Sequence, residues 1–294
     1  MTLIKDMLKQ GRTFSFEFFP PKNDGERDIL VQTLRNLESL SPSFVSVTYR
    51  GGRSSRKLTH DLVVGIKNTT SITPMAHLIC VDHTRLELAE ILVDLRKGGI
   101  ENLMALGGDP PETPEVEYGE LRFASELVEL AQAIGGFSIG VAVQPIGHPN
   151  SPDLASDRKY LARKLELADF GVTQFFFKPQ EYFSVVEDLS KLGNNKPILP
   201  GIMPVTHLSS IESMKKMGAQ VPDEMVQKLE SAYQSAPDSQ KAQEVRKCGI
   251  EIATELCSKL LEGGAPGLHF YTLNRSKATR EIYDQLGLKD LSQN

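Results

Sequence analysis

The chain has 294 residues, a formal net charge of -5 and a pI near 5.8, with 40% hydrophobic and 24% charged residues. This composition is typical of a globular protein with a full core, and its acidic balance argues against non-specific nucleic-acid binding, which needs a basic surface. No segment has the length and apolar character of a membrane span or a signal peptide, and the three cysteines lack metal-site or disulfide spacing. We expect a cytoplasmic protein that handles small molecules.

Short apolar segments rich in β-formers alternate with longer amphipathic segments. Eight segments predict strands: 14–19, 44–49, 74–80, 101–108, 137–143, 170–177, 197–203 and 267–273. Between them, apolar residues recur at steps of three and four, as expected of helices that cover a sheet. This alternation predicts an α/β fold, a single closed parallel (β/α)8 barrel, or TIM barrel. A doubly wound open sheet is the alternative, but it normally has a glycine-rich phosphate loop after its first strand, where this chain has Phe19-Pro20-Pro21.

The connection between the seventh and eighth predicted strands is much longer than the others. Residues 204–266 contain helical patterns near 207–218, 222–234 and 239–262. We interpret this segment as extra helices, a helical insertion packed on the barrel. With residues 1–12 as an N-terminal helix and no low-complexity linker, we expect one catalytic barrel domain over residues 1–294.

The first predicted strand, F-S-F-E-F-F, contains one carboxylate, Glu17, among aromatic residues. Strand side chains alternate between two faces, so Phe14, Phe16 and Phe18 would pack against outer helices while Glu17 points into the barrel. A buried charge is costly unless it is paired, wetted or protonated. Two interpretations follow: an edge strand with one face in water, or a catalytic acid whose surroundings favour its neutral form.

Other predicted strands also have a polar residue near the C-terminal end. These residues are Thr48, His77, Asp109, Gln144, Gln174 and Tyr271, with Asn274 and Arg275 just beyond the last strand. Each alone has a structural explanation, such as a satisfied hydroxyl, a core histidine or a turn aspartate. Together they have the layout of an active site at the mouth of a barrel. No group has metal-site spacing and no serine elbow is present, so we expect the chemistry to come from a bound cofactor.

The features above lie in the segments FSFEFFPPK, FVSVTYRGG, MAHLIC, ALGGDPP, HPNSPD, VTQFFF, PGIMPV and HFYTLNR. In this order they resemble the flavin-dependent bacterial type of methylenetetrahydrofolate reductase, over residues 12–288. The resemblance implies a barrel that binds FAD non-covalently and forms homo-oligomers. It also implies that NADH or NADPH reduces the flavin and leaves. Then 5,10-methylenetetrahydrofolate takes its place and is reduced to 5-methyltetrahydrofolate, a ping-pong reaction of one-carbon metabolism that supplies methionine synthesis.

The resemblance also implies roles for individual residues. Glu17 resembles the general acid that helps to open the five-membered ring of the folate, and Asp109 resembles the aspartate beside flavin and pterin. Folate contacts would come from Glu17, Asp109, Gln174, Tyr271 and Arg275. Flavin contacts would come from Thr48, His77, Gly107, Gly108, Asp109, Phe123, Ala124, Gln144, His148, Asp157 and Lys164. Without the resemblance, Lys164 would be a solvated helix lysine and Asp157 a helix first-turn residue.

Several positions depart from the family pattern. Gly107 stands where several members have arginine, and Gln144 where some have an aromatic ring, which would stack on a nucleotide better than an amide does. Three further departures are Ser210 for a folate-contacting glutamine, Met214 for a phenylalanine and Lys178 for an acidic residue. Two other functions stay open: a cofactor-free barrel lyase or aldolase, and a non-catalytic folate- or flavin-binding subunit.

Overall fold

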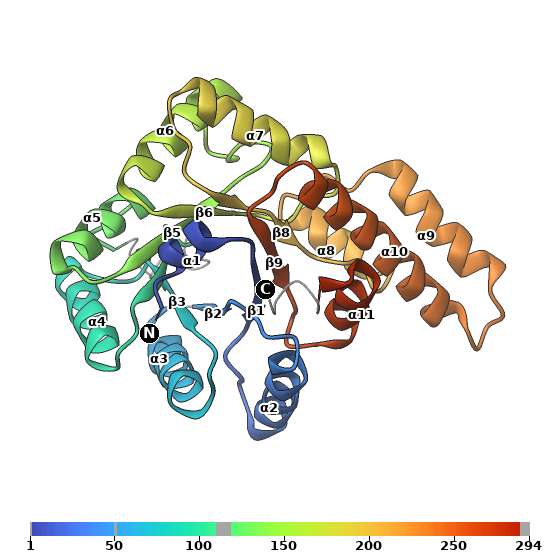
Figure 1. The fold of residues 1–294 in the computed structure, drawn as a ribbon, viewed down its shortest axis with the longest axis horizontal. Coiled ribbons are helices and arrows are strands. Elements are labelled where there is room, and N and C mark those ends of the chain that lie inside the picture. The colour runs from blue at the N-terminus through green and yellow to red at the C-terminus, as the bar shows by residue number, and fades with distance from the viewer. Residues whose placement is uncertain (1, 50–51, 110–118, 289–294) are drawn as a thin grey trace.

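The computed structural model of the protein describes residues 2–49, 52–109 and 119–288, without the side chains of residues 52–55. Parallel strands form the centre and helices surround them (Figure 1). The strands are β1 (Thr13–Phe18), β2 (Phe44–Val47), β3 (Pro74–Ile79), β4 (Asn102–Leu106), β5 (Ser138–Val143), β6 (Phe170–Thr173), β7 (Ile198–Leu199), β8 (Gly201–Ile202) and β9 (Gly267–Tyr271). The helices are α1 (Ile4–Gln10), α2 (Asp24–Glu38), α3 (Gly52–Thr69), α4 (Arg85–Lys97), α5 (Ala124–Ile134), α6 (Leu154–Leu167), α7 (Pro179–Lys191), α8 (Ser210–Lys216), α9 (Asp223–Ser235), α10 (Lys241–Glu262) and α11 (Lys277–Leu286).

The sheet closes on itself at Pro200. The strand order is β7-β6-β5-β4-β3-β2-β1-β9-β8, and only Pro200 separates β7 from β8 along the chain. Proline has no N–H to give to a strand ladder, so the seventh strand is split in two. The Pro200 carbonyl still accepts a hydrogen bond from His269 N at 3.0 Å, and Thr173 Oγ1 accepts one from Gly201 N at 2.8 Å. The (β/α)8 barrel is therefore confirmed, and the open doubly wound sheet is wrong.

Strand alternation separates an outer core from an inner one. Phe14, Phe16 and Phe18 face outward and pack with the helices, two of them against the ring of Tyr283 on α11. A separate inner cluster consists of Ile4, Phe44, Met75, Met104, Phe170, Val172 and Leu199. Helix α1, which lies across the centre of the ring in Figure 1, is fixed there by hydrogen bonds from Ile4 N to Asn102 Oδ1 and from Lys5 N to Ser138 Oγ. This apolar plug fills the N-terminal end of the barrel.

The long connection before β9 contains α8, α9 and α10, in agreement with the predicted helices there. Helices α8 and α9 form a second core against the barrel, made of Phe175, Met203, Val205, Ile211, Met214, Ala219, Val221, Met225, Leu229 and Val245. Helix α10 starts in this second core and continues into the main one through Ile250, Leu256 and Leu260. Among the helices described, none is long and apolar enough to cross a membrane.

Gly249 is the point where α10 comes closest to the chain that follows β8. A Cβ atom at this position would lie 1.7 Å from the carbonyl oxygen of Val205. Because the Val205 oxygen belongs to the backbone, no change of side-chain rotamer can relieve this steric clash. Glycine at 249 therefore sets how closely α10 approaches the end of the seventh strand.

We predict that Gly249→Ala destabilises the protein, although alanine is the better helix former by about 1 kcal/mol. Overpacking costs about 1–3 kcal/mol, and the closeness of Val205 O puts the cost at the upper end or beyond. Urea unfolding should show a lower midpoint than wild type. The matched control is Gly65→Ala in α3, where nothing lies within 4 Å of an added Cβ, and its midpoint should not fall. Equal midpoints for both variants would contradict the packing argument.

Candidate active site at the barrel mouth

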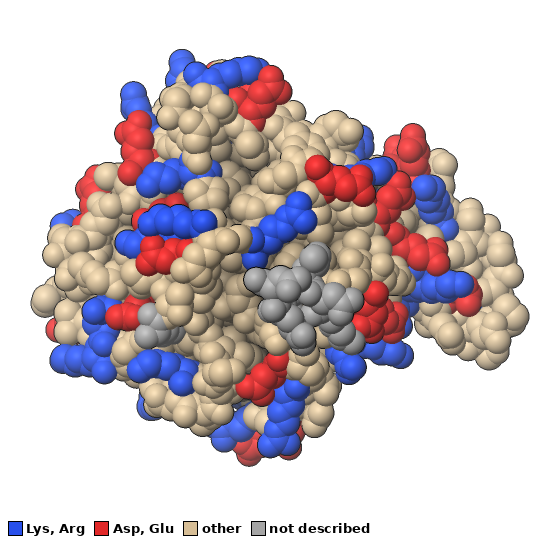
Figure 2. All heavy atoms as spheres, in the orientation of Figure 1, with Lys and Arg blue, Asp and Glu red and all other residues tan. Residues whose placement is uncertain are grey.

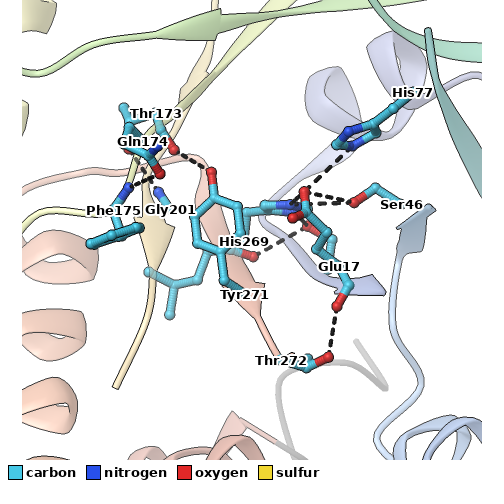
Figure 3. Close-up of polar contacts among 12 residues, drawn as sticks. Glu17, Ser46, His77, Thr173, Gln174, Phe175, Gly201, His269, Tyr271 and Thr272 are labelled. Atoms are coloured by element: carbon cyan, nitrogen blue, oxygen red, sulfur yellow. Dashed lines mark hydrogen bonds and ion pairs between the residues drawn. The ribbon is translucent and has the colours of Figure 1, made fainter. Parts of the chain in front are cut away.

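Glu17 lies inside the barrel near the C-terminal end of β1, and only 9% of its surface is exposed. Its Oε2 atom accepts a hydrogen bond from Ser46 Oγ at 3.4 Å and lies 3.4 Å from His77 Nε2 and 3.6 Å from His269 Nε2 (Figure 3). These neighbours come from β2, β3 and β9. Because β1 pairs with both β2 and β9, the edge-strand interpretation of Glu17 is wrong.

The protonation of Glu17 is governed by its histidine neighbours. Burial acts to raise its carboxyl pKa, but the hydrogen bond with His269 and the positive charges of His77 and His269 outweigh burial, so the pKa lies below its usual value. Burial lowers the pKa of His77, against the attraction of Glu17. The expectation that the surroundings of Glu17 keep it neutral is therefore wrong here. Its aromatic neighbours in sequence point outward, and the groups that face it are imidazoles.

A second polar layer lies beneath the carboxylate. Ser15 Oγ is 2.8 Å from His269 Nδ1, and strand register pairs these two residues directly. With Nδ1 engaged by serine, Nε2 of His269 faces Glu17 and Ser46, whose hydroxyl is 3.5 Å away. Sequence reasoning missed Ser15, Ser46 and His269 as site residues. The available signal was alternation, which puts Ser15 on the face of Glu17 and His269 on the face of Tyr271.

Tyr271 of β9 is the register partner of Glu17, and its side chain reaches the end of β6. Its hydroxyl donates to the Thr173 carbonyl at 2.6 Å, and its ring meets Phe175 edge-on at 6.1 Å. Burial raises the pKa of Tyr271 well above its usual value, so the hydroxyl remains a donor at neutral pH. Gly201 makes room for the ring, since a Cβ there would lie 2.6 Å from Tyr271 Cε2. Beside it, Gln174 Oε1 accepts from the N–H of Phe175 at 3.0 Å.

The turn after β4 contains Gly107, Gly108 and Asp109. The Gly107 carbonyl accepts from the N–H of Val81 at 3.2 Å. Gly108 has φ +87°, and a Cβ there would lie 3.0 Å from Val81 Cγ2, so both conformation and space favour glycine. Asp109 is exposed and lies next to residues 110–118, which are outside the described part.

The loop between β5 and α6 contains Gln144 and His148, and the first turn of α6 contains Asp157. Asp157 is 7% exposed, and its Oδ1 accepts from the backbone N–H of His148 at 2.9 Å. On the same helix, Lys164 donates from Nζ to the carbonyl of Ala142 in β5 at 2.7 Å. Burial lowers the pKa of Lys164 to about 8, against the attraction of Asp157. Lys164 is therefore not the solvated helix lysine that its local sequence suggests.

The remaining predicted positions lie at strand ends or just beyond them. Thr48 is buried at the end of β2, Ala124 opens α5 after the exposed ring of Phe123, and Arg275 is exposed beyond β9. Asn274 links the segments that follow β9 and β1, because its side-chain amide accepts a hydrogen bond from Phe19 N at 2.8 Å and donates one to Phe19 O at 2.9 Å.

Three positions that depart from the family pattern have structural partners of their own. Ser210 opens α8 and donates to the His207 carbonyl at 2.6 Å, Met214 belongs to the second core, and Lys178 is exposed before α7.

The predicted residues thus fall into two groups. The inward strand-end residues surround one mouth: Glu17, Thr48, His77, Gln174 and Tyr271. The loop residues lie outside it on the rim: Asp109, Phe123, His148 and Arg275.

The sequence of this chain is similar to those of methylenetetrahydrofolate reductases. The family model for methylenetetrahydrofolate reductase matches residues 3–287. The 5,10-methylenetetrahydrofolate reductase of Escherichia coli (strain K12) is 34% identical over 279 residues, which cover 94% of this chain and 90% of that protein. The Pectobacterium carotovorum enzyme of the same name is 34% identical over 284 residues, covering 95% and 92%. Methylenetetrahydrofolate reductase (NADH) 1 of Arabidopsis thaliana is 35% identical over 306 residues, and the chain spans about half of it, 51%.

A solved structure shares the fold. A Clostridium thermocellum protein described as binding two copies of 5-methyl-5,6,7,8-tetrahydrofolic acid superposes with a TM-score of 0.62 at 17% identity, over 99% of both chains. At this identity the likeness concerns the barrel alone. The family match covers nearly the whole sequence, and the bacterial relatives align over nine-tenths of their length. The chain therefore belongs to the methylenetetrahydrofolate reductase family.

Proposed function

We propose that this protein reduces 5,10-methylenetetrahydrofolate to 5-methyltetrahydrofolate, using non-covalently bound FAD that NADH or NADPH has reduced. The two substrates would occupy the barrel mouth in turn, which makes the reaction ping-pong. The observation that carries the proposal is Glu17, a buried carboxylate held between His77 and His269 at the mouth of a barrel of this family.

The mouth has buried polar atoms of the kind that a flavin can satisfy. Thr48 Oγ1 has no hydrogen-bond partner within the described residues, and His77 Nε2 has none beyond its ion-pair contact with Glu17 Oε2 at 3.4 Å. Such atoms cost free energy unless a ligand or water pairs with them. A flavin ring system has several nitrogen and oxygen atoms along its edge, so these residues fit it. Bound FAD would supply the hydride, and Lys164, whose ammonium group lies behind β5, would pair with its diphosphate.

Glu17 would deliver the proton that the reaction consumes. Reduction of the methylene group takes one hydride and one proton, and the ring nitrogen that leaves the methylene carbon needs that proton. Because His77 and His269 hold the pKa of Glu17 low, the proton must reach Oε2 when substrate fills the mouth. Excluding water strengthens the burial that already acts to raise the pKa, and His269 Nε2, 3.6 Å away, can pass a proton. The carboxyl would thus be an acid only in the filled site.

The first test of the proposal is the absorbance spectrum. Purified protein, as isolated or after incubation with FAD, should show flavin absorbance that bleaches when NADH or NADPH is added without oxygen. Adding 5,10-methylenetetrahydrofolate should restore the oxidised spectrum, because the flavin passes its hydride on. The faster of the two nicotinamide cofactors identifies the donor. A protein that cannot be loaded with FAD, and that oxidises neither cofactor, contradicts the proposal.

Glu17→Gln should separate the two half-reactions. The amide keeps the shape of the side chain but has no acidic proton to transfer, so reduction of the folate should slow by about 10²–10⁴-fold. Reduction of the flavin by NADH or NADPH needs no acid at this position and should stay within a few-fold of wild type. Stopped-flow absorbance measures both steps on the same sample. Folate reduction at the wild-type rate would show that Glu17 is not the acid.

The affinity for FAD should fall as the pH rises through about 8. The pKa of Lys164 is lowered to about 8, so its ammonium is charged below that pH and neutral above it, and only the charged form attracts a diphosphate. Titration of the apoprotein with FAD at pH 7 and pH 9 measures the change. Lys164→Met should bind FAD more weakly at pH 7 and lose most of this dependence. An unchanged pH profile in the variant would remove Lys164 from the diphosphate site.

A further inference from the structure

Arg158 is a buried cation for which the proposed chemistry has no direct use. It lies in the second turn of α6 and is 3% exposed, less than any other described Asp, Glu, Lys or Arg side chain. Burying a guanidinium is costly unless its donors are paired. Its partners should therefore reveal why it is there.

The guanidinium holds the chain that leaves β5. Its Nη1 donates to the Gln144 carbonyl at 3.1 Å and its Nη2 to the Pro145 carbonyl at 2.5 Å. The same Nη1 lies 3.0 Å from Asp157 Oδ2, and Nε lies 3.4 Å from Asp188 Oδ2 of α7. One planar fork thus joins two successive carbonyls and a carboxylate, an arrangement that lysine cannot reproduce.

Asp157 extends the same attachment along the loop. While its Oδ2 meets Arg158, its Oδ1 accepts from the backbone N–H of His148 at 2.9 Å and from Ser151 Oγ at 3.0 Å. The Asp157–Arg158 pair therefore holds the loop of residues 144–151 at four points from the inside. This loop lies at the mouth, and it contains two of the predicted flavin contacts, Gln144 and His148.

General stability does not explain this pair well. A buried ion pair is often no more stabilising than apolar residues of the same shape, and one attested benefit of such pairs is a single defined conformation. Here three of the hydrogen bonds go to backbone groups of one loop, at Gln144, Pro145 and His148. A preformed loop binds more tightly because less ordering is needed when the ligand arrives.

We propose that Arg158 is a positioning residue for the flavin: with Asp157 it holds the loop of residues 144–151 in its binding conformation before FAD arrives. Arg158 acts through Gln144, Pro145 and Asp157 and need not touch the cofactor. This inference rests on the proposed function, because it takes FAD as the ligand of the mouth.

The test is the affinity of the apoprotein for FAD, measured by flavin fluorescence. In Arg158→Met the dissociation constant should rise at least about tenfold, which corresponds to about 1.4 kcal/mol. At saturating FAD the turnover number should stay within about threefold of wild type, since no reacting group is lost. Loss of a residue with only a structural role would not weaken FAD binding while leaving the turnover number nearly unchanged. If Arg158→Met does not fold, Arg158→Lys replaces it, with binding weakened about threefold or more, because a point charge cannot join both carbonyls and the carboxylate.

Arg96 offers a matched control at the other end of β5. Its Nη1 donates to Glu101 Oε1 at 2.9 Å and to the Gly136 carbonyl at 2.8 Å, so Arg96→Met also removes a carboxylate and a carbonyl contact. It should lower the thermal midpoint and leave FAD affinity unchanged.

Three outcomes would overturn the inference. The first two are wild-type affinity in the Arg158 variant and an equal loss of affinity in Arg96→Met. The third is a wild-type protein that binds no FAD, which would overturn the proposed function as well.

Discussion

Closure of the barrel at Pro200 is the constraint on which the candidate site depends. The proline gives no N–H to the ladder of the seventh strand, but its carbonyl keeps the hydrogen bond from His269 N, and Thr173 Oγ1 accepts from the N–H of Gly201. The Thr173 carbonyl, left at the strand end, accepts the hydroxyl of Tyr271. Because Gly201 has no side chain, the tyrosine ring fits over the break. The contacts that close the sheet therefore also set the positions of two site residues, His269 and Tyr271.

The barrel interior divides into an apolar half and a polar half, and Glu17 lies in the polar one. At the N-terminal end, Ile4 of α1 and its inner cluster exclude water, and the buried side chains of Asn102 and Ser138 accept hydrogen bonds from the backbone of α1. Above that plug, a single carboxylate would be unstable on its own, so Ser46, His77 and His269 surround it. His269 is in turn held by Ser15, which makes the lower layer part of the site. The carboxylate at the mouth thus depends on residues one layer deeper, where a ligand would not reach them.

Sequence reasoning predicted the barrel, the inward face of Glu17 and most strand ends, because those follow from periodicity within single segments. It failed where the answer depended on partners distant in the chain. The pairing of Ser15 with His269 spans 254 residues, and the lowered pKa of Glu17 follows from histidines on two other strands. Backbone partners leave no sequence signal at all, so nothing in the local sequence of Arg158 indicates its bonds to the carbonyls of Gln144 and Pro145.

Charge is divided across the mouth in a way that suits two successive ligands. The carboxylate of Glu17 lies on the side of β9, β1, β2 and β3, while Lys164 of α6 donates to the Ala142 carbonyl of β5. The charge of Arg158 on the same helix is balanced by Asp157 and Asp188. In the proposed function Lys164 would pair with the diphosphate of a bound cofactor, and Glu17 would face whichever substrate exchanges hydride. The bound cofactor and the exchanging substrate then need different properties of the residues that contact them. The loop of residues 144–151 should be rigid, as its four internal attachments make it, whereas the Glu17 side needs a carboxyl whose protonation changes with occupancy. In the proposed function His77 and His269, whose Nε2 atoms lie 3.4 and 3.6 Å from Glu17 Oε2, are the side chains through which a proton would reach the carboxylate.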